Sequence, residues 1–204
     1  MYVPEIYKNE NQDEILDFIQ KNSFGILINQ SNGNIAATHI PLELKIRENS
    51  EQFLVGHISK ENPQWHNFEK DNTVLAIFSG PQTYISPSWY DHENVPTWNY
   101  SAVHVYGKIK IIEGQKVYDS LKQLVDKYES NVENPTKIED YSKKTMLQIR
   151  GIVAFEIEIK KIQAVKKMSQ NRDEKNFLNI ISELEKSTNF NDLNVADELK
   201  KCPR

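Results

Sequence analysis

Hydrophobic residues follow a helical period in several parts of the chain. Apolar side chains recur at intervals of about 3.6 residues, which is the pattern of an amphipathic helix. In the second of these segments, Asn62 can cap a helix and Pro63 suits its first turn. The pattern predicts helices at 13–22, 62–70, 115–130 and 141–148, and two more within 173–201.

Short apolar runs rich in β-branched residues lie between these helices. The first two are separated by Ser31-Asn32-Gly33, and an Asn-Gly pair favours a tight hairpin turn. Hairpin connections with inserted helices predict a β-dominated α+β fold, a closed or partly open antiparallel barrel rather than a parallel α/β sheet. The predicted strands are 24–29, 34–44, 52–58, 73–78, 100–112 and 152–159, with weaker patterns at 82–85 and 163–167.

Length and composition favour one domain with an appended tail. The 204 residues contain 26% charged and 38% hydrophobic residues, and we expect a barrel domain at 1–172 with a helical tail at 173–204 packing on it. No apolar run reaches the roughly 20 residues of a membrane span, and the amino terminus lacks a secretory pattern. The single cysteine, Cys202, can form no internal disulfide. We therefore expect a cytoplasmic protein without membrane contacts.

The charge balance bears on nucleic-acid binding. A formal net charge of -4 argues against a broad basic footprint for DNA, because non-specific affinity comes mostly from Lys and Arg at phosphates. The most basic segment, Ile159–Lys167, is interpreted as a solvated strand face. Any direct DNA contact is therefore expected to be local.

The segment GHISKENPQWHNF, from Gly56 to Phe68, is a candidate phosphate site. A strand is predicted to end at His57, and Ser59 and Lys60 stand just before the helix capped by Asn62. A helix amino terminus offers unpaired N–H groups and partial positive charge, so this corner could hold a phosphate. The alternative is an ordinary capped helix on the surface.

The histidines do not indicate a metal site. Histidine occurs at 39, 57, 66, 92 and 104 without an HExxH spacing, and no CxxC pair is present. His39 follows Thr38 in a predicted strand, where a histidine side chain usually lies on one face of the sheet with its polar groups satisfied. If the strands of His39 and His57 paired, the two imidazoles could form the polar floor of a pocket.

Aromatic residues are concentrated between Tyr84 and Gly107. Prolines at 81, 87 and 96 stiffen this stretch, which we expect to be an irregular connection into the strand that begins near Tyr100. The rings could form a small hydrophobic core, a subunit interface or a wall for a planar ligand. No nucleophile elbow occurs, so no catalytic residue is assigned. The aromatic residues of this stretch and the histidine that follows them on the strand are Tyr84, Trp89, Tyr90, Trp98, Tyr100 and His104.

Several motifs in order resemble the PaiB-like family of FMN-binding negative transcriptional regulators. They span residues 1 to about 185 and are HIPLEL, GHISKENPQW, FSGPQTYISPSWY, VPTWNYSAVHVYG and MSQNR. The resemblance implies a split antiparallel β-barrel like that of pyridoxamine-phosphate oxidases. It also implies a homodimer with flavin sites at the interface.

The resemblance further implies cofactor-binding residues. The phosphate of FMN would lie near His57, Ser59, Lys60 and Asn62, with Thr38 and His39 along the cofactor; Trp98, Tyr100 and His104 would contribute from the subunit interface. The function expected from this is transcriptional regulation by a homodimer that senses flavin or a related ligand. The alternatives are a flavin-dependent oxidoreductase acting on a small molecule and, third, a binder of haem or another planar ligand with a histidine as axial ligand.

Overall fold

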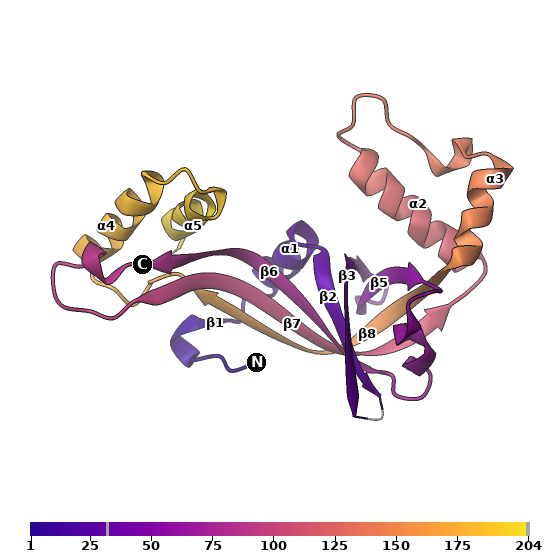
Figure 1. Cartoon of the computed structure of the whole chain (residues 1–204), viewed down its shortest axis with the longest axis horizontal. Coiled ribbons are helices and arrows are strands. Elements are labelled where there is room, and N and C mark those ends of the chain that lie inside the picture. Colours follow the sequence, from indigo (N-terminus) through magenta and orange to yellow (C-terminus); the bar gives the residue numbers. More distant parts are fainter. Residues whose placement is uncertain (32, 203–204) are drawn as a thin grey trace. The chain divides into compact units, whose positions relative to one another are not determined.

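The computed structural model describes residues 1–31 and 33–202 (Figure 1). The strands are β1 (Lys8–Asn9), β2 (Phe24–Ser31), β3 (Asn34–Pro41), β4 (Glu43–Ile46), β5 (Gln52–Ser59), β6 (Thr73–Ile85), β7 (Thr97–Ile112) and β8 (Ile152–Lys167). The α-helices are α1 (Gln12–Lys21), α2 (Gln115–Glu129), α3 (Lys143–Met146), α4 (Glu174–Glu185) and α5 (Phe190–Lys200). Short 3₁₀ helices are η1 (Glu5–Tyr7), η2 (Pro63–Asn67), η3 (Pro87–Trp89), η4 (Ile138–Asp140) and η5 (Leu147–Gly151).

The sheet has the strand order β3-β2-β6-β7-β8-β5-β4, and β1 pairs with β8. The pairs β2–β3, β2–β6, β4–β5, β5–β8 and β1–β8 are antiparallel. This arrangement confirms the predicted antiparallel, β-dominated fold. Gly33 has the positive φ of 81° that the predicted hairpin turn between β2 and β3 requires, while Asn32 lies outside the described residues.

The chain divides into two compact units. Unit 1 comprises Met1–Phe18, Phe78–His104 and Gln163–Arg204, and unit 2 comprises Ile19–Ile77 and Val105–Ile162. The long strands β6, β7 and β8 each contribute one part to unit 1 and another part to unit 2. The boundary expected at residue 172 stays a prediction, and these two units follow a different division of the chain.

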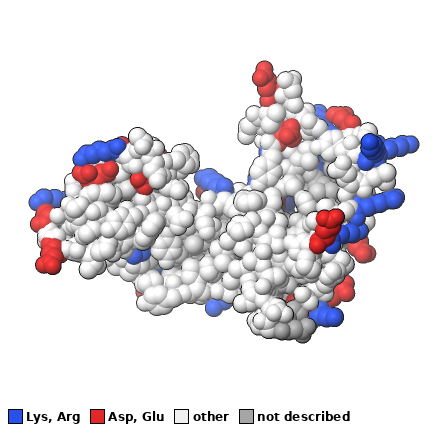
Figure 2. Space-filling view, in the orientation of Figure 1, with Lys and Arg blue, Asp and Glu red and all other residues white. Residues whose placement is uncertain are grey.

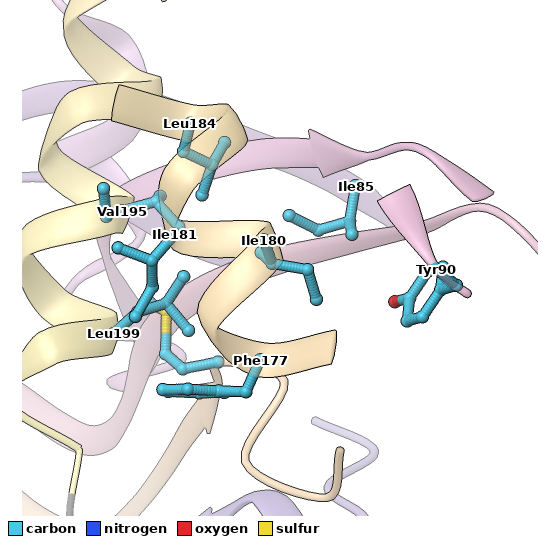
Figure 3. Packing of buried hydrophobic residues seen from close by; sticks show 10 residues of the cluster. Ile85, Tyr90, Phe177, Ile180, Ile181, Leu184, Val195 and Leu199 are labelled. Carbon is cyan, nitrogen blue, oxygen red and sulfur yellow. The ribbon is translucent and has the colours of Figure 1, made fainter. Parts of the chain in front are cut away.

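Unit 1 has a hydrophobic core built around the C-terminal helices (Figure 3). The apolar sides of α4 and α5 pack with Ile85 at the end of β6, with Tyr90 and with Met168 after β8. Trp89 and the half-buried Cys202 pack against the same cluster. Asp173 caps α4, because its carboxylate accepts a hydrogen bond from Asn176 N at 3.0 Å.

Unit 2 has its own core between the strands. Phe68 and Phe155 are almost fully buried and meet edge to face, with ring centroids 5.5 Å apart. The helix α2 contains no buried residue, and its Val117 packs against the small cluster of Val55, Ile112 and Ala154. Polar contacts fasten α2, since Lys127 Nζ lies 2.7 Å from Glu43 Oε2 and Tyr128 donates to Glu43 Oε1 at 3.2 Å.

Several details of the expected secondary structure are wrong. The strand expected at 34–44 is two strands, β3 and β4, and the strands expected at 152–159 and 163–167 are one strand, β8. The helix expected at 141–148 is α3 followed by η5. The helix expected at 62–70 is the shorter η2, which Asn62 caps by accepting from Gln64 N at 3.0 Å. The separate strands expected at 73–78 and 82–85 are one strand, β6. Its pairing with β2 covers only Val74–Ile77, so the missing N–H of Pro81 removes no hydrogen bond to β2.

No helix among residues 1–31 and 33–202 combines the length and the apolar character that crossing a bilayer would need.

Candidate functional site

The candidate site residues fall into two groups. Thr38, His39, His57, Ser59, Lys60 and Asn62 belong to unit 2, whereas Trp98, Tyr100 and His104 belong to unit 1.

In unit 2 the corner after β5 is a tightly hydrogen-bonded turn. Lys60 N donates to Gly151 O at 2.8 Å, and Asn62 N donates to Ser59 O at 3.0 Å. Glu61 N donates to Ser59 Oγ at 3.2 Å. With the Gln64 N–H bound to the Asn62 side chain and Pro63 lacking an N–H, the backbone donors from 60 to 64 are all engaged.

This result corrects the expectation of unpaired N–H groups at the corner. The five-residue η2 is also too short to supply the dipole expected from a longer helix. A phosphate at this corner could therefore be held only by side chains. The groups to consider are the Lys60 ammonium, the Ser59 hydroxyl and the His57 imidazole.

The strand geometry places His57 and Ser59 on the same face of β5. Residues two apart in a strand share a face, and Ile58 between them is buried in the core. Burial lowers the pKa of His57, so its imidazole is neutral at neutral pH. Lys60 is exposed, and its ammonium has no ion-pair partner among residues 1–31 and 33–202. These three side chains offer a cation, a hydroxyl and a ring N–H, a donor set that fits a phosphate group.

Thr38 and Asn62 serve a different purpose, because they belong to a polar network. Asn62 Nδ2 donates to Thr38 Oγ1 at 2.8 Å, and the Thr38 hydroxyl donates to Gln64 Oε1 at 2.5 Å. Gln64 Nε2 donates to Leu27 O at 3.1 Å. Gln64 thereby joins the turn η2 to both β2 and β3, although its side chain is only 3% exposed.

Sequence reasoning missed Gln64. A glutamine inside a polar stretch such as ENPQWHN gives no signal of burial, because glutamine is mostly found at the surface. Asn29, also buried, donates from Nδ2 to Gln64 O at 3.5 Å, and its Oδ1 has no hydrogen-bond partner within the described part of the chain.

His39 lies apart from this network. It is exposed on β3, on the opposite face from Thr38, and its ring stacks on Phe24 with centroids 6.4 Å apart. Its strand pairs with β2, whereas the strand of His57 pairs with β4 and β8. The condition for a shared histidine floor, that these two strands pair with each other, is therefore not met.

In unit 1 the aromatic residues divide between core and surface. Tyr90 is buried against α4, as Figure 3 shows, and Trp89 packs on the same core. Tyr84 and Trp98 are 44% and 54% exposed and meet edge to face, with ring centroids 6.2 Å apart. The small-core interpretation thus holds for Trp89 and Tyr90. Tyr84 and Trp98 lie at the surface, and for them the subunit interface and the wall for a planar ligand stay predictions.

Trp98, Tyr100 and His104 share one face of β7. They alternate with the buried residues Asn99, Ser101 and Val103, and burial lowers the pKa of His104. The unit therefore presents a partly exposed aromatic face, a kind of surface that often contacts a partner or a planar ligand.

The late motif MSQNR forms the turn between β8 and α4. Ser169 has a positive φ of 53°, and its hydroxyl exchanges hydrogen bonds with the buried Asn99 side chain at 3.0 and 3.1 Å. Arg172 covers the Tyr90 ring at 5.0 Å. The motif thus positions α4 on unit 1.

Comparison with known proteins adds to this geometry. Residues 1–161 match the family described as "Putative FMN-binding domain". The chain is 41% identical over 206 residues to "Protease synthase and sporulation protein PAI 2" of Bacillus subtilis, covering 98% of this chain and 99% of that protein. The chain belongs to this PaiB-like FMN-binding family. The resemblance in the sequence motifs is thereby confirmed.

Solved structures support the fold of a PaiB-like protein. An FAD and haem binding protein from Mycobacterium smegmatis aligns with a TM-score of 0.58 at 11% identity, over 79% of this chain and 73% of that one. A flavocytochrome from Azotobacter vinelandii aligns with a TM-score of 0.57 at 15% identity, over 87% and 78%. The fold is a split antiparallel β-barrel with peripheral helices, as expected.

Gln64 provides a test of the polar network. Gln64→Ala removes the partners of the Thr38 hydroxyl and of Leu27 O, and we expect it to lower the free energy of unfolding on the order of 1–3 kcal/mol. Urea unfolding measures this change, with Gln148→Ala as the control because Gln148 is exposed and lies in another short helix of unit 2. Equal unfolding midpoints for the two variants would contradict the assigned role.

Proposed function

We propose that this protein is a regulator of the PaiB type, a homodimer that binds FMN or a related flavin and represses transcription in response to it. The observation that carries the proposal is the match to PAI 2 over nearly the whole of both chains. The sporulation and protease-synthase role in that protein's name supports a regulatory role here.

The FMN part of the proposal rests on the side chains at the corner of unit 2. Lys60 would hold the flavin phosphate with its ammonium, while Ser59 and His57 would donate hydrogen bonds from the shared face of β5. Thr38, Asn62 and Gln64 would act indirectly, because their network fixes η2 and so the position of Lys60. FMN, once bound, supplies a redox-active ring that can report the metabolic state of the cell.

The homodimer rests on the aromatic face of unit 1. Exposed rings such as Tyr84 and Trp98 are enriched in protein interfaces, where they bury large apolar area. In the proposed dimer, the rings of one copy lie against the second copy, and Trp98, Tyr100 and His104 border the flavin.

The net charge of the protein gives little support to direct binding of DNA, which is one route to transcriptional repression. Figure 2 shows Lys and Arg interspersed with Asp and Glu on the face drawn, and the net charge is -4. Direct DNA binding would therefore depend on local contacts, and repression through a metabolite or another protein is the other route.

A second candidate function is a flavin-dependent oxidoreductase acting on a small molecule. It is favoured by the fold shared with the flavocytochrome, although that likeness concerns the fold alone. The absorption spectrum of the FMN-loaded protein, recorded with NADPH and then with an added electron acceptor, separates the candidates. In an oxidoreductase NADPH reduces and bleaches the flavin, and the acceptor takes the electrons and restores the absorption with continued consumption of NADPH.

Lys60 tests the cofactor site. Lys60→Ala removes the ammonium that would hold the flavin phosphate, and we expect it to weaken FMN binding by roughly tenfold to hundredfold. Flavin fluorescence quenching gives the dissociation constant. Lys108→Ala is the control, because Lys108 belongs to β7 and its ammonium donates to the Thr73 hydroxyl at 2.7 Å. Equal affinities of the two variants would place the flavin phosphate elsewhere.

Trp98 tests the dimer. We expect Trp98→Ala to shift the protein toward monomer at micromolar concentration, because it removes the largest exposed ring of the proposed interface. Light scattering coupled to size exclusion measures the mass, and Leu178→Ala serves as an exposed apolar control on α4. A fully dimeric Trp98 variant would remove this face from the interface.

DNA binding is tested by a band-shift assay at stated salt. The protein, with and without FMN, is mixed with a pool of genomic fragments and excess unlabelled competitor. We expect a subset of fragments to be retained, with affinity that changes on adding FMN. If no fragment is selected in either state, repression by this protein does not proceed through direct DNA contact.

A further inference from the structure

Strand β8 ends in unit 1 at a partly buried lysine that the candidate flavin site does not use. Lys167 Nζ donates to the Thr97 hydroxyl at the start of β7, at 2.5 Å, and lies 5.7 Å from the centroid of the Tyr7 ring. All three side chains are partly buried, and all three residues belong to unit 1. None of them is among the nine residues expected to bind FMN. Three segments that are distant in the sequence therefore meet at one ammonium group.

No carboxylate neutralises this ammonium group. Within residues 1–31 and 33–202, Lys167 forms no ion pair, and Thr97 offers it only a neutral oxygen. Burial lowers the pKa of Lys167, and the positive charge of Arg172 lowers it further. Both effects disfavour the charged form, and no carboxylate of the described chain counters them. A negative charge placed beside Lys167 would therefore be stabilised.

The carboxylates on the adjoining elements contact other partners. Asp173, which follows Arg172, accepts hydrogen bonds from the backbone and side-chain nitrogens of Asn176 as the cap of α4. None of these carboxylates forms an ion pair with Lys167. The ion pairs that they form are Glu198 with Lys166 and Lys201, Glu5 and Glu10 with Lys8, and Asp91 with Lys175.

The MSQNR turn fixes this arrangement. Gln170 Nε2 donates to Lys166 O at 2.6 Å and to Ile6 O at 3.4 Å. Met168 N donates to Gln170 Oε1 at 2.7 Å, and the hydrogen bonds of Ser169 described above hold the same turn against β7. Two like charges repel each other, so the turn holds the two cations of this region together against their own interaction. A partly buried cation held in this way is a candidate for a functional site.

The hydrogen-bond donors at this point match an oxyanion. An ammonium group has three N–H donors, and Thr97 occupies one of them. The Thr97 hydroxyl accepts from Lys167 and so keeps its own proton to donate. We propose that Lys167 and Thr97 bind the carboxylate or phosphate group of a small molecule, with the Tyr7 ring beside it. This site belongs to unit 1, whereas Lys60 belongs to unit 2, so the protein would bind a second, anionic ligand.

The test measures how fast each lysine is acylated. The full-length protein is treated with an amine-reactive ester at mildly alkaline pH, with sodium phosphate or sodium acetate replacing chloride at constant ionic strength. Peptide mass spectrometry gives the rate at each lysine. A bound anion favours the ammonium form and covers it, so we expect acylation of Lys167 to slow saturably by at least about threefold. The probe that protects at the lower concentration identifies the anionic group.

Lys108 is the internal control in the same samples. Its ammonium also donates to a threonine hydroxyl, that of Thr73 at 2.7 Å, but its side chain is exposed. We expect its acylation rate to change by less than about 1.5-fold at constant ionic strength. Thr97→Val removes the hydroxyl at nearly constant volume and should raise the half-protecting concentration for Lys167 at least about fivefold. Thr73→Val is the matched control and should leave the protection of Lys167 unchanged.

Three outcomes would overturn the proposal. These are acylation of Lys167 that neither anion slows, equal slowing at Lys167 and Lys108, and an unchanged half-protecting concentration in a Thr97→Val protein that unfolds at the wild-type midpoint. The first two outcomes need no substitution. Loss of FMN binding in Lys60→Ala should leave the protection of Lys167 by phosphate intact, so the flavin proposal and this one fail separately.

Discussion

The arrangement of unit 2 depends on one buried amide. Gln64 uses both ends of its side chain, accepting from the hydroxyl of Thr38 in β3 and donating to the carbonyl of Leu27 in β2. A buried polar group without partners would cost about 1–3 kcal/mol, so the turn is stable in one position only, where both bonds form. Because Lys60 lies just before this turn, the position of its backbone follows from a residue that is itself almost fully buried.

Much of the fold could be predicted because local signals and tertiary structure agree. The Asn-Gly turn and the apolar alternation give the β2–β3 hairpin correctly, although the strand expected at 34–44 divides into β3 and β4, and the stripe of α2 gives its bounds within one residue. Errors arise where local signals act alone. Gly80 and Pro81 look like a strand break, yet β6 continues through them because that stretch lies past its pairing with β2. The motif order identifies the family, which a residue pattern by itself would not.

The site was predicted less completely, because its decisive contacts are long-range. The carbonyl of Gly151, 91 residues beyond Lys60, occupies the Lys60 N–H, and no local rule could reveal this bond. The alternation of side chains along a strand can be derived from the sequence, and it indicates which residues share a face of the sheet. It separates Thr38 from His39 and groups Trp98 with Tyr100, since side chains alternate between the faces of a sheet. Identity at a motif position therefore says less about a residue's role than the direction in which its side chain points.

The half-buried thiol of Cys202 has a practical consequence. It is the sole cysteine of the chain, it packs beside α4 and α5, and burial raises its pKa, so little thiolate forms while that core is closed. Its alkylation should thus be slower than that of a fully exposed thiol and should become faster when the C-terminal helices open. The native thiol therefore reports on the opening of the unit 1 core, and mass spectrometry can follow its alkylation without a cysteine being introduced.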